Sequence, residues 1–233
     1  MISSSLHRIA WYSAASLLPL LMLGTMAFAP HDLGHAAAAR NRYIGAKACK
    51  NCHKSKAKGE QFAKWSESKH AKAYARLGEQ AAKETGAKLG VTDPQQDAQC
   101  LKCHVTAYGL DKKKVKRSFD PKQGVQCESC HGPGERHAKA RFKAASSGDA
   151  DPEAYTEVPE DEIIRQPGAK VCLECHNEKS PSFKPFCFKE RRAVISHLNP
   201  QKPRTAEDLE ALKCTCEDCK CKQAECGDYP KHK

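Results

Sequence analysis

One short cysteine–histidine pattern, repeated four times, holds the residues best suited to chemistry in this chain. In each repeat two cysteines are separated by two residues and followed directly by a histidine, at residues 49–53, 100–104, 127–131 and 172–176. This C-x-x-C-H pattern is the attachment motif of c-type haem. The two thiols add to the vinyl groups of the haem, and the adjacent histidine becomes the proximal ligand of the iron. The sequence therefore predicts four covalently bound haem c groups.

The predicted attachment residues follow from the motifs. The thioether cysteines are Cys49, Cys52, Cys100, Cys103, Cys127, Cys130, Cys172 and Cys175, and the proximal iron ligands are His53, His104, His131 and His176. Paired cysteines also occur in thioredoxin-like redox sites and in zinc sites. A redox pair needs a βαβ context that is absent here, and zinc does not require a histidine directly after each pair. Neither alternative explains the four repeats.

Histidines outside the motifs decide what each iron can do. An iron with a second histidine is low-spin and suited to electron transfer, whereas an iron with an empty sixth position can bind small molecules. The candidates are His70, His137, His197 and His232, and His232 is next to last in a Lys-rich tail where fraying is expected. We therefore expect His70, His137 and His197 to be the distal ligands. Three distal ligands for four haems would leave one iron open.

For two of these histidines, the spacing from the nearest motif indicates which haem each can bind. His137 follows His131 by six residues, so it should serve a haem other than the third. His197 lies twenty-one residues after His176, which is enough chain to wrap around the fourth haem.

The N-terminal segment indicates export. His7 and Arg8 precede an almost wholly apolar run from residue 9 to 29, and Ala37 to Ala39 form a small-residue cleavage site before Arg40. Cleavage after Ala29 and an uncleaved membrane anchor are the alternatives. We expect a signal peptide at 1–39, a tetrahaem cytochrome domain at 40–200 and a Cys-rich C-terminal extension at 201–233. The mature protein is expected in the periplasm, without stable membrane insertion.

Composition limits the fold and the partners. The hydrophobic fraction is 39%, and much of it lies in the first thirty residues, so the body must fold around its cofactors. The sequence predicts a mostly α fold, with short helices and loops wrapped around four covalently bound haems and little or no β-sheet. The net charge of +11 favours redox partner proteins with acidic surfaces, and no nucleic-acid-binding motif accompanies the lysines.

Periodicity places a few elements. Apolar residues on one face predict a helix from Lys56 to Leu77, with His70 on that face, and a second helix from Gly134 to about Ala145. The acidic, proline-rich stretch from Asp149 to Asp161 is predicted to be a loop. Ala206 to Lys213 has a short helical pattern.

Several local sequences resemble the tetrahaem cytochrome c-554 family of ammonia-oxidising bacteria. The resemblance runs from about Tyr43 to Pro200 and is carried by Tyr43-Ile44-Gly45, by Trp65, Ser68, His70 and Ala71, by the Gly124–Gly134 segment around the third motif, and by Phe183, Phe186 and His197. It implies a mostly helical monomer with closely packed haem pairs. It also implies pairing of His53 with His137, His131 with His70, and His176 with His197, which leaves His104 with a five-coordinate haem.

The resemblance implies a periplasmic electron carrier rather than an enzyme. In that family the donor is hydroxylamine oxidoreductase and the acceptor is a quinone-linked membrane cytochrome. The alternative is a nitric oxide or peroxide reductase at the five-coordinate haem on the second motif, with Tyr108 as the nearby hydroxyl.

The C-terminal region departs from the family. Six further cysteines follow the haem motifs at Cys187, Cys214, Cys216, Cys219, Cys221 and Cys226. In an exported protein they predict disulfides, with a thiolate metal site as an alternative. The stretch from Cys216 to Lys220 also matches C-x-x-C-K, a lysine-ligated haem motif. A structural or metal-sensing tail is a third interpretation of the extension.

Overall fold

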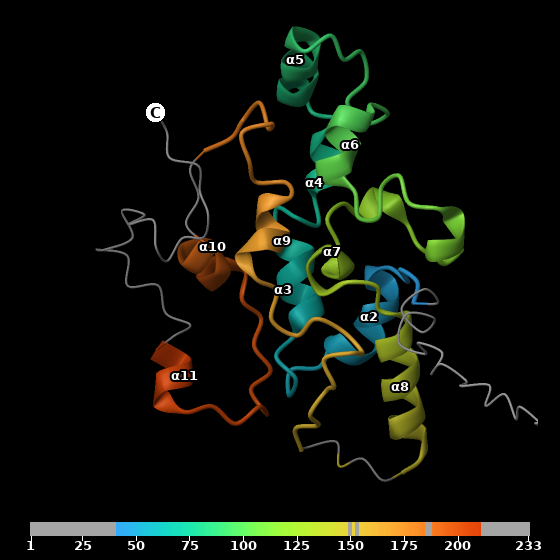
Figure 1. Ribbon diagram of the computed structural model, residues 1–233, viewed down its shortest axis with the longest axis vertical. Coiled ribbons are helices and arrows are strands. Elements are labelled where there is room, and N and C mark those ends of the chain that lie inside the picture. The colour runs from blue at the N-terminus through green and yellow to red at the C-terminus, as the bar shows by residue number, and fades with distance from the viewer. Residues whose placement is uncertain (1–40, 149–150, 152–153, 185–187, 211–233) are drawn as a thin grey trace, which may run out of the picture.

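The computed structural model describes residues 41–148, 151, 154–184 and 188–210. Short helices joined by long loops make up this part of the chain (Figure 1), and it contains no β-strand beyond an isolated bridge between Tyr43 and Val115. The mostly α prediction is confirmed. Within the described residues no helix is long and apolar enough to cross a membrane.

The helices are mostly one to three turns long. They are α2 (Ala46–His53), α3 (Gln61–Glu67), α4 (Ala73–Arg76), α5 (Gln80–Lys88), α6 (Ala98–His104), α7 (Cys127–His131), α8 (Glu135–Ser146), α9 (Ala169–Leu173), α10 (Phe188–Ile195) and α11 (Ala206–Glu210), with 3₁₀ turns η1 (Lys112–Lys114) and η2 (Pro121–Gln123). Aspartates begin three of them: Asp97, Asp111 and Asp120 each accept a backbone N–H two residues ahead.

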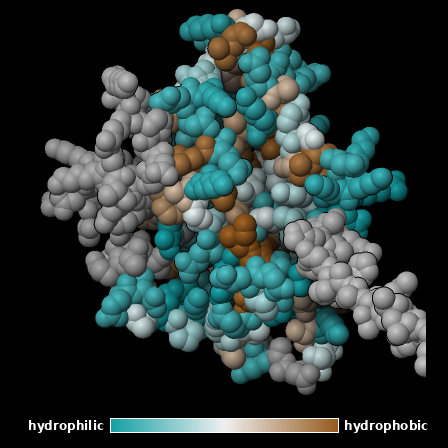
Figure 2. All heavy atoms as spheres, in the orientation of Figure 1, coloured by the Kyte–Doolittle hydropathy of each residue, from teal (hydrophilic) through white to brown (hydrophobic). Residues whose placement is uncertain are grey.

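Little apolar side-chain packing holds these helices together. Leu77, Leu101 and Val105 form a small cluster, against which Tyr74 and Cys100 pack. The face of the molecule seen in Figure 2 is mostly hydrophilic, with hydrophobic residues in small separate patches. The described chain therefore packs as expected of a protein that folds around bulky cofactors.

The predicted second helix is confirmed, whereas the predicted first helix is wrong over its middle. α8 spans Glu135–Ser146, close to the expected range. Between Lys56 and Leu77 the chain forms α3 and α4, separated by Ser68 in an extended conformation whose Oγ accepts from the N–H of Ala71 at 3.3 Å. At the start of the range, Glu60 is left-handed with φ 52°, so the helix begins only at Gln61.

Candidate haem-binding site

Each C-x-x-C-H motif occupies a helical turn. The first three motifs end α2, α6 and α7 at their histidines, and the fourth continues α9 through a bond from the N–H of His176 to the carbonyl of Cys172 at 2.9 Å. A helical turn brings the two cysteines of each motif to neighbouring positions on one side of the chain. All eight motif cysteines are free of disulfides, so every thiol is available for a thioether bond.

Three pairs of histidine rings face each other across the described fold. Ring centres are 6.2 Å apart for His53 and His137, 6.1 Å for His70 and His176, and 5.8 Å for His131 and His197. A metal ion bound between two imidazoles holds the ring centres about 6 Å apart, because each metal–nitrogen bond is about 2 Å long and each nitrogen is about 1 Å from its ring centre. The three pairs therefore fit axial ligation of three haem irons.

Electrostatics favour the neutral form that a ligand histidine needs. Desolvation by the surrounding chain is the main cause that lowers the pKa of His53, His70, His131, His137 and His176. A neutral imidazole keeps a lone pair for a metal, whereas the protonated form has none. The donor set is thus chemically suited to iron.

Hydrogen bonds at three histidines determine which ring nitrogen stays free to bind a metal. Nδ1 of His104 donates to the carbonyl of Ala73 at 2.8 Å, that of His131 to Ile164 at 2.6 Å, and that of His197 to Ile195 at 2.9 Å. Since a carbonyl can only accept, the proton is on Nδ1 and Nε2 is left as the ligand atom. Ile164 also lines a cavity of about 400 Å³.

The structure changes two of the three pairings that the resemblance implied. The ring of His53 faces that of His137, which is the pairing that the resemblance implied for these two residues. The resemblance implied pairing of His131 with His70 and of His176 with His197, whereas in the structure the ring of His131 faces that of His197 and the ring of His70 faces that of His176.

Main-chain contacts explain both changes. The carbonyl of His70 accepts from the N–H of Val125 at 3.0 Å, so its backbone lies beside the third motif while its ring faces the fourth. The residue after His197 contacts the turn that follows the first motif, since a Cβ on Gly59 would collide with the carbonyl of Leu198. That contact places the segment that carries His197 beside the turn after the first motif.

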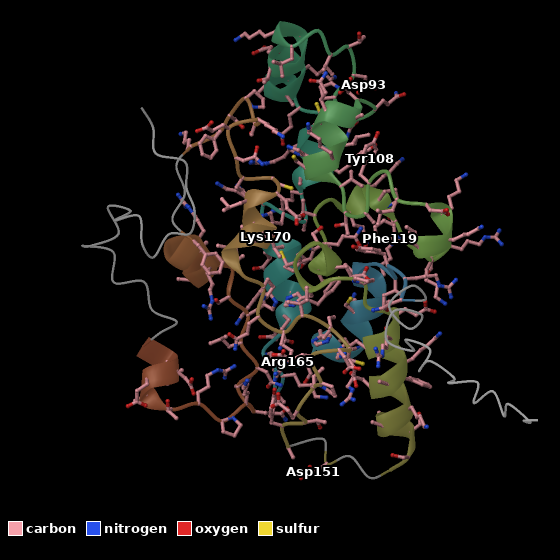
Figure 3. The ribbon with its side chains drawn as sticks, in the orientation of Figure 1. Asp93, Tyr108, Phe119, Asp151, Arg165 and Lys170 are labelled. Atoms are coloured by element: carbon pink, nitrogen blue, oxygen red, sulfur yellow. The ribbon has the colours of Figure 1, made fainter. Side chains whose placement is uncertain are left out.

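His104 is left without a histidine partner among the described residues. The three spare histidines within that part face other proximal histidines. Tyr108, labelled in Figure 3, is 41% exposed, so it is not packed into the interior. His232 and the six further cysteines, with the disulfide, metal-site and C-x-x-C-K interpretations, lie outside the described residues, as does the predicted signal segment at 1–39.

Thiols of different motifs lie close enough to affect one another's pKa. A hydrogen bond between Cys49 and Cys127 raises the pKa of the Cys49 thiol and lowers that of Cys127. Burial followed by the charge of Cys172 raises the pKa of Cys130 to about 11, and burial followed by the influence of Cys103 raises that of Cys175 to about 12. The motifs therefore follow one another in space in the order first, third, fourth, second.

A buried carboxylate joins the first and third motifs. Glu128, between the two cysteines of the third motif, accepts backbone N–H groups from Ile44 at 2.9 Å, Gly45 at 2.7 Å and Gly134 at 2.7 Å. Burial raises the pKa of Glu128, and these three bonds oppose the rise. The carboxylate holds the N-terminus of α2 and the start of α8 against α7.

Comparison with known proteins finds a family match for the part of the chain that carries the first three motifs. Residues 48–132, which contain the first three motifs, match the family model described as cytochrome c554 and c-prime. The sequence of this segment is similar to that of the cytochrome c554 family. The chain also resembles the structure of the reduced state of cytochrome c554 from Nitrosomonas europaea, at 24% identity over 80% of this chain and 84% of that one, with a TM-score of 0.45. No curated protein sequence matches the chain.

The cytochrome is a multihaem c-type electron-transfer protein whose cofactors are four haem c groups. Sequence reasoning found the motifs and the spare histidines, but it missed two acidic residues that the structure brings to them. Glu128 lies inside the third motif, where nothing in the pattern marks it. Glu162 contacts His137 from a loop in which acidic residues are common.

Proposed function

We propose that this cytochrome is a periplasmic carrier that passes electrons between redox proteins. We assign His53 and His137 to the iron of the first motif, His131 and His197 to the third, and His176 and His70 to the fourth. His104 then holds the haem of the second motif with an open sixth position. The three histidine pairs at 5.8–6.2 Å carry this proposal.

The chemistry of the donor set supports a carrier. When bound, a haem iron with two histidine ligands takes up and releases one electron with little change in its coordination. The protein supplies neutral imidazoles, fixes their orientation through Nδ1 at His104, His131 and His197, and holds adjacent attachment motifs in contact. Contact between neighbouring motifs is what a carrier of several electrons requires.

Charge supports a partner with an acidic surface. Residues 111–117, which we name the basic loop, expose Lys112, Lys113, Lys114 and Arg117 and carry one acidic residue, Asp111. Such a cluster attracts an acidic partner and orients it before contact. By analogy with the family, the donor is a hydroxylamine oxidoreductase and the acceptor a quinone-linked cytochrome.

The same proposal includes export through the segment at 1–39. It also includes the division of the chain into a tetrahaem domain at 40–200 and an extension at 201–233.

A second candidate function rests on His104. Because His70, His137 and His197 face other histidines, the haem of the second motif is the place where nitric oxide or peroxide could be reduced. The carrier is favoured because three of the four motif histidines face a second histidine, the arrangement suited to electron transfer.

Electron paramagnetic resonance of the oxidised holoprotein tests both functions. The carrier proposal expects low-spin signals from three haems and a high-spin signal from about one haem in four that responds to nitric oxide. Four low-spin haems would remove the open site and the reductase with it. Steady turnover of nitric oxide that disappears in a Cys103→Ser variant would favour the reductase over the carrier.

A further inference from the structure

Glu162 makes a contact with His137 that differs in kind from those described for His104, His131 and His197. One carboxylate oxygen of Glu162 lies 3.3 Å from Nδ1 of His137, and the other lies 2.6 Å from the guanidinium of Arg141. The side chain of Glu162 is 9% exposed and that of His137 is 16% exposed. The pair is therefore largely shielded from solvent, where a charge acts more strongly on its neighbour.

The contrast with the other histidines is chemical. Nδ1 of His104, His131 and His197 donates to a neutral backbone carbonyl. At His137 the acceptor is a carboxylate, which draws the Nδ1 proton more strongly and makes Nε2 a more basic ligand. A more basic ligand stabilises the oxidised iron over the reduced iron and so lowers the reduction potential.

The chain holds Glu162 in place by contacts on both sides. Arg141 lies one turn after His137 on α8, so the same helix presents the ligand and the cation that binds the carboxylate. Arg136, at the start of that helix, forms an ion pair with Asp161. The N–H of Glu162 donates to the carbonyl of Pro159 at 3.1 Å. These contacts attach the loop to α8 beside His137.

We propose that Glu162 is a positioning residue that lowers the reduction potential of the first haem through His137. The proposal rests on the ligation of that iron by His53 and His137 given above. Arg141 shares the carboxylate, so only part of its negative charge acts on the imidazole. Among the histidines whose Nδ1 partner is described, only His137 contacts a carboxylate. The first haem is therefore the one whose oxidised iron this contact would stabilise.

A spectroelectrochemical titration of the purified tetrahaem holoprotein tests the proposal. Replacement of His137 by Met identifies the component that belongs to the first haem, because a methionine ligand raises the potential of its iron. In Glu162→Gln the amide keeps the shape of the side chain but not its charge. The same component should then shift to higher potential while the other three stay in place.

Two control variants separate contact from charge. Asp161→Asn removes one negative charge from the neighbouring residue, which is 61% exposed and does not contact His137, and it should leave the first component unchanged. Glu162→Asp keeps the charge but withdraws the carboxylate from Nδ1 by one methylene, and it should raise the potential as Glu162→Gln does.

The outcomes distinguish the two proposals. If His137→Met leaves every component and every low-spin signal unchanged, the ligation itself is wrong. If His137→Met shifts a component that Glu162→Gln leaves in place, the ligation stands and the role of Glu162 is overturned. An equal shift in Asp161→Asn also overturns it, since net charge would then suffice. Loss of the low-spin signal in Glu162→Gln would mean that Glu162 only holds His137 in place.

Discussion

The ring centre of His197 lies 5.8 Å from that of His131, although His176 is the motif histidine that precedes His197 in the chain. The fourth motif instead faces His70, at 6.1 Å. Spare histidines thus reach across the fold rather than back to the nearest motif. Each of these spare histidines brings together two segments that are far apart in sequence.

This pairing predicts where a distal variant acts. His197→Ala should convert one low-spin haem to a high-spin haem in the otherwise unchanged protein. In a Cys127→Ser, Cys130→Ser protein that lacks the third haem, the same change should add no further high-spin signal. Paramagnetic resonance of holoproteins with equal haem content makes the comparison. The opposite result, with no added signal only in a Cys172→Ser, Cys175→Ser protein, would restore the pairing of His197 with His176.

A glycine positions His70. Gly124 has φ 73°, and a Cβ there would lie 2.7 Å from the carbonyl oxygen of His70. Gly124→Ala should lower the free energy of unfolding by about 3 kcal/mol, since a strained φ and a backbone clash add together. It should also disturb the low-spin signal of the fourth haem. Denaturant unfolding of the holoprotein measures the first effect.

Gly90 provides the matched control for that prediction. It has the same φ of 73° and nothing within 4 Å of an added Cβ. Gly90→Ala should therefore cost only the backbone term, about 1 kcal/mol, and leave the spectrum unchanged. Equal losses at the two positions would show that the contact with His70 has no effect.

Glu135 should make stability depend on acid pH. Hydrogen bonds from Arg42, and then from Lys116 and Lys139, hold its pKa well below the ordinary range. A lowered carboxyl pKa contributes stability that is complete above about pH 4.5 and is lost as the pH falls further. Glu135→Gln should lower the free energy of unfolding at pH 7 by about 1–2 kcal/mol, because solvent screens the exposed partners.

Denaturant titrations at pH 7 and pH 3 check this sign. The difference between the wild type and Glu135→Gln should shrink at pH 3, because there Glu135 is protonated in the unfolded chain and still ionised in the folded one, so proton uptake favours unfolding. Glu67→Gln, at an exposed position, is the control and should change stability little at either pH. A difference that grows in acid would contradict the assigned direction of the pKa.

The basic loop should govern how fast a partner reduces the cytochrome. Lys112→Glu with Lys113→Glu should lower the second-order rate by about tenfold at low ionic strength, with the difference vanishing in high salt. Lys83→Glu with Lys88→Glu on α5 changes the net charge equally and is the control. Stopped-flow reduction by an acidic redox protein gives the rates. Equal slowing by both pairs would mean that net charge, not the loop, attracts the partner.

The parts of the structure that follow from short-range pattern were predictable. The four motifs, the helix α8 and the near absence of strands all depend on spacing along a few residues. The break between α3 and α4 was not predictable in this way. It depends on Trp65 Nε1 donating to the carbonyl of Val125 at 2.9 Å and on the bond from Val125 to His70, which are long-range contacts.

The candidate site, too, was predictable from the sequence only in part. Composition and counting gave His70, His137 and His197 as the spare histidines, but which ring each one faces depends on where main-chain contacts fix the segment. Glu162 could not be found from sequence, because its contact with His137 spans 25 residues and starts in a loop with no periodic pattern. The sequence signal that could have pointed to Glu162 is the pair of arginines on α8, Arg136 and Arg141, which form ion pairs with residues of that loop.

The carboxylate of Glu128 has a consequence for how the molecule opens. Its acceptor bonds hold Ile44, Gly45 and Gly134, which begin two separate helices. Because the three amides share one acceptor side chain, displacement of the Glu128 carboxylate releases all of them together. The first and third attachment segments therefore open as one cooperative unit, and their amide protons should exchange with deuterium at a common rate.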